Sequence, residues 1–498
     1  MSEQNTNRGS GGTLADRADP LLYNEDLAPV SEEKRTWTWT SVAALWVGMV
    51  VCVPTYMLTG TMVSQGMSWS QAVFTVLLGN VIVLLPMLGV GHAGTKYGIP
   101  FPVLLRSSFG TVGANIPALL RGLVACGWFG IQTWVGGSAI YTMLNTLSEN
   151  AFAGSPLPVL GINIWQLVCF LGFWGLHVWF IAKGTESIRW LETYAAPFLI
   201  LMGLVLLYWA YDKAGGFGAM LSTPSKFAAG GPKEGQFWSV FFPSLTAMVG
   251  FWATLSLNIP DFTRYCRTQK DQVLGQAFGL PPTMALFAFI GVAVTSATVV
   301  IYGEAVWDPV KLLGRMGGST VAIALLVLAI ATLTTNLAAN VVAPANGFSN
   351  INPQRISFKA GGYITAALGV VMFPWKILES TGGYIFTWLI GYSALLGPIA
   401  GILIADYFLL RRTELDVDAL FMAKGKYRFG NGFNSKALIA LAVGVAPNIP
   451  GFLVAAGAVK NVPPIFNDIY VYAWFVGFFL SGGLYRLLSS IPQTAKND

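Results

Sequence analysis

Long apolar stretches separated by short polar segments make up most of the chain. A run of about 20 apolar residues can cross the hydrocarbon core of a bilayer as a helix. Twelve such runs occur, at 38–64, 69–92, 114–146, 164–182, 190–211, 238–259, 274–302, 319–345, 360–376, 382–409, 436–457 and 466–489. The pattern therefore predicts an all-α membrane protein with 12 transmembrane helices, between polar tails at 1–36 and 491–498.

Two of the predicted spans are interrupted near their centres. In the first, Pro54 removes a backbone N–H and frees a carbonyl one turn earlier. In the sixth, Gly250, Phe251 and Trp252 lie mid-span. Interrupted helices five spans apart are typical of inverted-repeat transporters, which hold a substrate and a cation at the breaks. A proline kink combined with a small-residue helix contact is the alternative explanation.

Charged residues are scarce and unevenly placed. Asp, Glu, Lys and Arg together form 10% of the chain, against about 25% in an ordinary soluble domain. With a cytoplasmic N-terminus, 22 of the 29 Lys and Arg residues fall on the cytoplasmic side of the twelve spans. Because membrane insertion imposes this bias, we expect a multi-pass protein of the cytoplasmic membrane with both termini cytoplasmic. The same bias explains the net charge of +6 without a nucleic-acid partner.

The third span carries Trp128 and Gln132 on one face, because they are four residues apart. An indole beside a carboxamide offers a stacking surface and hydrogen bonds to a flat, polar ring. A buried amide needs a partner, so a hydrogen bond between helices is the alternative to a bound ring.

The eighth span contains a polar stripe. It consists of residues at a spacing of four, namely Thr332, Asn336 and Asn340. Ala331, Thr334 and Thr335 share another face, where two hydroxyls and freed carbonyls could coordinate a small hard cation through oxygen. Polar residues at membrane depth are usually functional, and hydrogen bonds between helices are the alternative.

Several chemistries lack the residues they require. The central parts of the first, third and eighth spans contain no carboxylate, which favours a neutral substrate over a permanent cation. The chain has no GxSxG, HExxH or Walker-type motif and no metal-binding cysteine spacing, so we expect neither an enzyme nor a resident cofactor. His177 in the fourth span is interpreted as a packed polar group rather than a proton relay.

Five segments together resemble the nucleobase–cation symporter family of hydantoin, allantoin and uracil permeases. They are GTKYGIPFPVLLRSSFG at 94–110, WFGIQTW at 128–134, GFWATLSLNIPDFTRY at 250–265, TLTTNLAANVVAPA at 332–345 and GPIAGILIADYFLLRR at 397–412. Within that family, NIPDFTRY, KYGIPFP and the PTY at 54–56 are most similar to bacterial allantoin permeases.

The resemblance implies a leucine-transporter-type fold. Inverted five-helix repeats would occupy 37–211 and 238–410, followed by a cytoplasmic loop and two further helices at 411–490. It implies a heterocyclic substrate between the indoles of Trp128 and Trp252, with hydrogen bonds from Gln132 and Asn340. Asn336, in the same polar stripe, is a further candidate. The implied cation site, for Na⁺ or H⁺ coupling, consists of the carbonyls of Gly48, Val51 and Ala331 and the hydroxyls of Thr334 and Thr335.

Two positions depart from the family pattern. Cys52 stands where an amide is common, and Phe251 stands where the hydantoin-type pattern has glycine. Both changes favour a small flat ring such as uracil. We therefore expect a monomeric, cation-coupled symporter that imports a neutral planar nucleobase or ureide by alternating access.

The alternative is a vitamin carrier of the same family, for thiamine or pyridoxine. Two indoles could hold a cationic ring through cation–π contacts. The lack of a carboxylate at membrane depth disfavours this reading.

Overall fold

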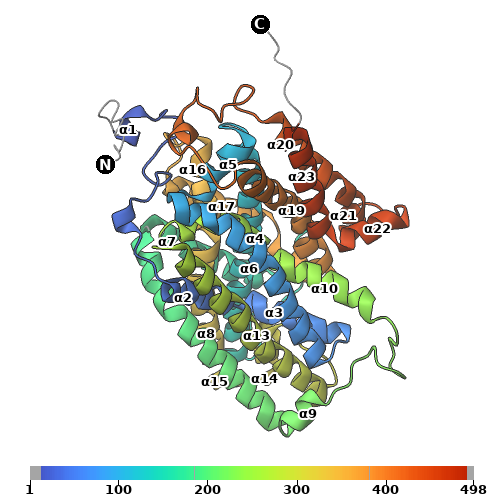
Figure 1. The fold of residues 1–498 in the computed structure, drawn as a ribbon. Coiled ribbons are helices and arrows are strands. Elements are labelled where there is room, and N and C mark those ends of the chain that lie inside the picture. The colour runs from blue at the N-terminus through green and yellow to red at the C-terminus, as the bar shows by residue number, and fades with distance from the viewer. Residues whose placement is uncertain (1–12, 184, 381, 491–498) are drawn as a thin grey trace.

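The computed structural model describes residues 13–183, 185–380 and 382–490. Throughout that part of the chain the regular structure is helical, apart from isolated bridges between Trp37 and Cys266 and between Gly430 and Phe433 (Figure 1). The all-α prediction is therefore confirmed.

The first half of the chain forms α1 (Leu14–Arg17), α2 (Trp39–Val50), α3 (Val53–Gln65), α4 (Trp69–Tyr97), α5 (Phe101–Phe109), α6 (Asn115–Leu147), α7 (Ile164–Lys183), α8 (Thr185–Ala214) and α9 (Phe217–Leu221). The second half begins with α10 (Phe237–Phe251), α11 (Ala253–Asn258), α12 (Pro260–Thr263), α13 (Gln269–Tyr302), α14 (Pro309–Met316), α15 (Ser319–Asn340), α16 (Val342–Ile351), α17 (Phe358–Val371) and α18 (Pro374–Ile377). It ends with η2 (Gly383–Ile390), α19 (Gly391–Ile404), η3 (Ala405–Leu410), α20 (Ser435–Val445), η5 (Ala446–Asn448), α21 (Ile449–Ala455), α22 (Pro464–Val471) and α23 (Ala473–Ser490).

Eight helical segments of the described chain are long and apolar enough to cross a membrane. The bent pairs α2–α3, with an angle of 60°, and α22–α23, with an angle of 88°, raise this number to ten. Helix α17 is apolar but has 14 residues, fewer than a full span requires. The chain is thus a multi-pass membrane protein, and the count of twelve spans stays a prediction.

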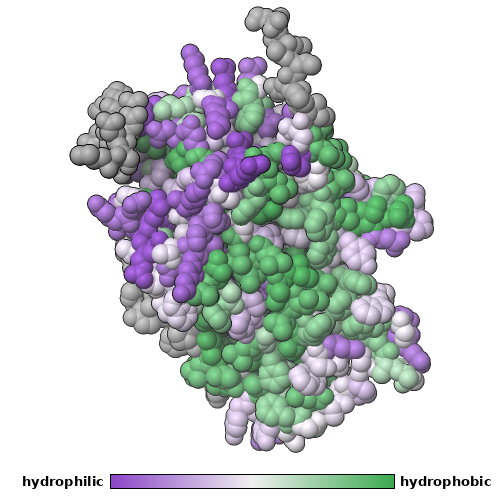
Figure 2. Space-filling model, in the orientation of Figure 1, coloured by the Kyte–Doolittle hydropathy of each residue, from purple (hydrophilic) through white to green (hydrophobic). Residues whose placement is uncertain are grey.

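Apolar side chains cover much of the outside of the molecule. Leu85, Leu286, Ile323 and Phe479 are each more than 60% exposed. Figure 2 shows hydrophobic residues as a broad band across the middle of the visible face, below a strongly hydrophilic end. Such a band is suited to lipid, because lipid chains solvate apolar side chains that water does not.

Helix packing divides most of the long helices into two groups. In the first, which we call the broken-helix group, α13 packs against α2, α3 and α4, and α4 packs against α10 and α11. In the second, the scaffold group, α6 packs against α7, α15, α16 and α17. Segments far apart in the sequence therefore meet inside each group. The two helix breaks lie where the two groups face each other.

The first break separates α2 from α3. Pro54 occupies the first turn of α3, where its missing N–H costs no hydrogen bond. Cys52 is extended (φ −143°, ψ 159°), and its N–H bonds to Val50 O at 2.9 Å instead of continuing the helical pattern to Gly48 O. The break thus frees the carbonyl of Gly48, one of the cation ligands that the family resemblance implies. Val50 O, the carbonyl one turn before Pro54, accepts the bond from Cys52 instead.

The second break separates α10 from α11 at Trp252. Its backbone (φ −100°, ψ 5°) leaves the helical region between the end of α10 and the start of α11. Gly250 allows this segment to lie directly against α19 and η2, since a Cβ there would meet Ser393 Oγ and Leu389 O. Both interruptions predicted from the sequence therefore exist as breaks in helices.

Candidate functional site

A small buried cavity of about 40 Å³ lies where the two helix groups face each other. The broken-helix group contributes Met49, Cys52, Pro54, Phe251, Trp252, Thr254 and Leu255. The scaffold group contributes Trp128, Gln132, Thr335, Ala339 and Asn340. Both helix breaks therefore open onto one cavity, together with the polar faces of α6 and α15.

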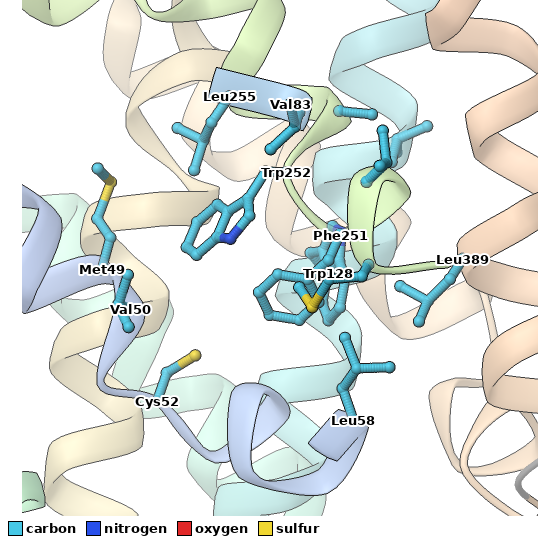
Figure 3. Packing of buried hydrophobic residues seen from close by; sticks show 14 of the residues in the cluster. Met49, Val50, Cys52, Leu58, Val83, Trp128, Phe251, Trp252, Leu255 and Leu389 are labelled. Carbon is cyan, nitrogen blue, oxygen red and sulfur yellow. The ribbon is translucent and has the colours of Figure 1, made fainter. Parts of the chain in front are cut away.

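Aromatic rings form one wall of this cavity. The ring of Phe251 contacts Trp128 with a centroid distance of 5.2 Å and Trp252 with a distance of 5.0 Å, in both cases edge to face. Trp46 makes a third edge-to-face contact, with Trp252 at 5.2 Å. Figure 3 shows Cys52 and Trp252 on opposite sides of the open space beside Trp128 and Phe251. Phe251 thus fills part of the space between the two indoles.

Two polar atoms of the cavity lining have no hydrogen-bond partner among the described residues. Gln132 Oε1 and Trp252 Nε1 are buried and have no hydrogen-bond partner in the described structure. One is an acceptor and the other a donor. Because a buried polar group without a partner is costly, a ligand with a matching donor and acceptor would be stabilised there.

Asn340 lines the cavity, and Asn336 does not. Asn340 lines the cavity and donates its Nδ2 hydrogen to Asn336 Oδ1 at 2.9 Å. Asn336 is fully buried one turn earlier and is not among the lining residues. Asn336 therefore supports Asn340 from behind the cavity, whereas the sequence analysis placed both among the substrate-binding residues.

The candidate cation ligands lie close to the same cavity. The carbonyl of Ala331 accepts hydrogen bonds from the hydroxyls of Thr334 (2.7 Å) and Thr335 (2.9 Å). Both hydroxyl protons therefore point to the helix backbone, which leaves oxygen lone pairs for a cation. Helices α2 and α15 are in contact, so the carbonyls of Gly48 and Val51 are on the neighbouring helix. Thr335 is the one of these five residues that also lines the substrate cavity.

Sequence reasoning missed a group of aromatic residues behind Trp128. The rings of Tyr384, Trp388 and Tyr392 contact Trp128 with centroid distances of 6.3, 5.9 and 6.3 Å. Tyr384 also donates its hydroxyl to Pro54 O at 3.2 Å, across to the first break. These residues recur every four positions, and that aromatic stripe was the signal available in the sequence.

Broken helices that meet at a buried, polar and aromatic cavity between two helix groups define a membrane transporter. Residues 29–477 match the family model described as permease for cytosine/purines, uracil, thiamine, allantoin. The chain therefore belongs to this permease family, as the sequence motifs indicated.

Two relatives are similar over nearly the whole chain. The purine-uracil permease NCS1 of Arabidopsis thaliana is 47% identical over 475 residues, covering 95% of this chain and 78% of the relative. The allantoin permease of Bacillus subtilis is 41% identical over 477 residues, covering 95% and 94%.

A solved transporter has the same fold. Mhp1, a nucleobase-cation-symport-1 family transporter, in a closed conformation with bromovinylhydantoin bound, aligns with a TM-score of 0.74 and 27% identity over 95% of this chain and 98% of that chain. The inward-facing conformation of Mhp1 aligns with a TM-score of 0.76 and 26% identity over 94% of each chain.

Proposed function

We propose that this protein is a secondary active, cation-coupled symporter that imports a neutral, planar heterocycle of the uracil, allantoin or hydantoin class. The observation that carries the proposal is the single cavity at which both helix breaks meet Trp128, Gln132 and Asn340. Rocking of the broken-helix group against the scaffold group would open this cavity to one side of the membrane at a time. The relatives and Mhp1 support the substrate class.

Two cavity residues favour a small ring. Cys52 contributes a thiol, which is a weak hydrogen-bonding group, and it lies 3.2 Å from the hydroxyl of Thr55. The side chain of Phe251 reduces the space between Trp128 and Trp252. A ring with few polar substituents, such as uracil, suits this lining better than the more polar allantoin.

The proposal includes a topology. The breaks in α2–α3 and α10–α11 support inverted repeats at 37–211 and 238–410. Twelve spans and a monomer are further parts of the proposal. Both ends of the described chain lie at the hydrophilic end of the molecule (Figures 1 and 2). The charge bias along the sequence makes this end the cytoplasmic one, in a protein of the cytoplasmic membrane.

Tryptophan fluorescence of the purified protein tests the substrate and the cation together. Uracil, allantoin, a substituted hydantoin and thiamine would each be titrated with and without Na⁺. We expect quenching by a neutral ring because two indoles line the cavity, and tighter binding with Na⁺ if sodium is the coupling ion. Quenching without a sodium effect would assign coupling to protons, and a response to thiamine alone would overturn the neutral-substrate proposal. The neutral-substrate proposal also rests on the lining, because no carboxylate of the described residues lines the cavity.

A further inference from the structure

A chain of buried hydrogen bonds runs from α7 to the cavity. It begins at Phe173 O, which lies 2.9 Å from His177 Nδ1. His177 Nε2 lies 3.0 Å from Asn336 Nδ2, and Asn336 Oδ1 accepts from Asn340 Nδ2 at 2.9 Å. His177 and Asn336 are fully buried, and Asn340 is 7% exposed. Of these residues, Asn340 lines the cavity, and His177 and Asn336 lie behind it.

The first link fixes the tautomer of His177. A backbone carbonyl oxygen can only accept a hydrogen bond, so Nδ1 must carry the proton that points to Phe173 O. In the neutral imidazole, Nε2 is then an acceptor. The rings of Phe129 and Phe173 lie edge to face with the imidazole at 5.0 and 4.8 Å, which limits its rotation.

A second carbonyl fixes the orientation of the Asn336 amide. Its Nδ2 lies 3.0 Å from Phe129 O, so this atom must be the nitrogen and not the oxygen. The two amide hydrogens then go to Phe129 O and to His177 Nε2. Thr133 Oγ1, at 3.2 Å, is a longer contact and donates its own hydrogen to Phe129 O at 2.7 Å. The amide oxygen of Asn336 therefore faces Asn340.

The last link decides what Asn340 presents to the cavity. One hydrogen of its nitrogen is held by Asn336 Oδ1. The amide oxygen therefore points away from Asn336 and is left for a ligand, together with the second N–H. We propose that His177 is a positioning residue that, through Asn336, holds Asn340 as a hydrogen-bond acceptor and thereby selects substrates with a ring N–H at that point. The selection of substrates rests on the proposed function. The direction of the hydrogen bonds from Asn340 through Asn336 to His177 does not. All members belong to the scaffold group, so the same polarity holds whichever way the cavity opens.

Nitrogen NMR of protein labelled with ¹⁵N-histidine tests the polarity without any ligand. The protein has two histidines, His92 and His177, so nitrogen signals from two imidazole rings are expected. The signals that are missing from a His177→Leu sample belong to His177. We expect His177 to carry its proton on Nδ1 with Nε2 unprotonated. A proton on Nε2, with Nδ1 unprotonated, would remove the hydrogen bond to Phe173 O and the acceptor for Asn336 Nδ2. That result would overturn the proposal, whatever the protein transports.

Ligand binding tests the effect on selection. The ratio of the dissociation constants of 1-methyluracil or 3-methyluracil to that of uracil measures the preference for a ring N–H. His177→Leu removes the acceptor for Asn336 and leaves a buried N–H unpaired, so we expect uracil affinity to fall about tenfold and the ratio to approach one. His177→Gln, whose amide oxygen can accept from Asn336, should restore most of the preference.

Matched controls separate positioning from packing. His92→Leu removes the other histidine, which pairs with Tyr407 outside the cavity, and should leave the ratio unchanged. Equal losses for uracil and its methylated forms in His177→Leu would make His177 a packing residue and overturn the proposal. If that variant does not fold, His177→Met carries the same test. Failure of the wild type to bind any neutral ring would contradict the proposed function, and the NMR result would still decide the polarity.

Discussion

Some residues at the cavity have free hydrogen-bonding atoms, and others are held by hydrogen bonds to their neighbours. Gln132 Oε1 and Trp252 Nε1 are buried without partners, so they are available to a ligand. Asn340 is tied to Asn336, and the hydroxyls of Thr334 and Thr335 are tied to Ala331 O. Substitution of one of these residues therefore removes a hydrogen-bonding group whose partner, or lack of one, the structure describes.

Gln132→Ala and Asn340→Ala should each abolish measurable uptake of the neutral ring. A ligand N–H or C=O buried without its partner loses roughly 1–3 kcal/mol, which corresponds to about tenfold or more in affinity. Radiolabelled uptake into proteoliposomes measures the effect. The matched control is Asn80→Ala, because Asn80 is a buried amide bonded to Val76 O on its own helix α4, away from the cavity. Normal uptake in both cavity variants would show that the site lies elsewhere.

Thr335→Ala should weaken the dependence of uptake on Na⁺ if sodium is the coupling ion. The substitution removes one of the proposed oxygen ligands, and hard cations bind through oxygen atoms. Uptake across a series of Na⁺ concentrations should require several-fold more sodium for half-maximal rate. Thr332→Ala is the control, since Thr332 bonds only to Leu328 O along the same helix and does not line the cavity. An identical sodium response in Thr335→Ala and wild type would remove Thr335 from the cation site.

At the scale of elements, close helix crossings fix the position of the cavity residues. Helices α6 and α17 cross where Gly130 meets Gly369, so that their backbones are in direct contact. A Cβ at Gly369 would lie 2.6 Å from the ring of Phe129 and 3.0 Å from Cys126 O. The crossing sits on the same helix as Trp128 and Gln132, and it holds α6 against the rest of the scaffold group.

Gly369→Ala should therefore destabilise the protein. Overpacking of this kind costs about 1–3 kcal/mol, because backbone atoms cannot move aside. Thermal unfolding in detergent should show a lower midpoint. Gly172→Ala on α7 provides the control, since nothing lies within 4 Å of its added Cβ and alanine is a better helix former than glycine. A midpoint for Gly369→Ala at or above that of wild type would contradict the close crossing.

At the scale of the whole molecule, two helix groups face each other across one cavity, inside a surface that is apolar around its middle. The hydrophilic end carries the N-terminal segment, where Arg17 pairs with Asp418 at 2.9 Å and Asp19 N–H bonds to Phe421 O. The N-terminal segment and the 411–434 region thus lie on the same side. The proposed topology places both segments on the cytoplasmic side.

Thiol labelling in intact cells tests the orientation. The four native cysteines are buried, so reaction at an introduced cysteine stands out. We expect Lys460→Cys to react with a membrane-impermeant maleimide, because it lies in a loop on the outer side of the proposed topology. Glu33→Cys should react only after the cells are permeabilised. Both positions are exposed in the structure, so the reverse pattern would invert the topology.

The pattern of the sequence determined the all-helical class, both helix breaks and the shared face of Trp128 and Gln132, because each depends on short-range spacing. The pairing of Trp128 with Trp252 and the place of Cys52 came from the family resemblance. Pro54 cannot donate a backbone hydrogen bond wherever it packs, and residues four apart in a helix, such as Trp128 and Gln132, share a face. These rules hold before any tertiary contact forms. They could not fix the number of full spans, since α17 is short and lengths alone do not decide which helices cross.

Only the tertiary structure decided which faces meet. His177 reads as a packed polar group in the sequence because its partners, Phe129 and Asn336, are on other helices. The structure brings these helices together and turns Asn336 away from the cavity lining. It likewise inserts Phe251 between two indoles that the sequence places 124 residues apart, at Trp128 and Trp252. The direction of a hydrogen bond and the width of a cavity depend on several helices at once, so no local pattern contains them.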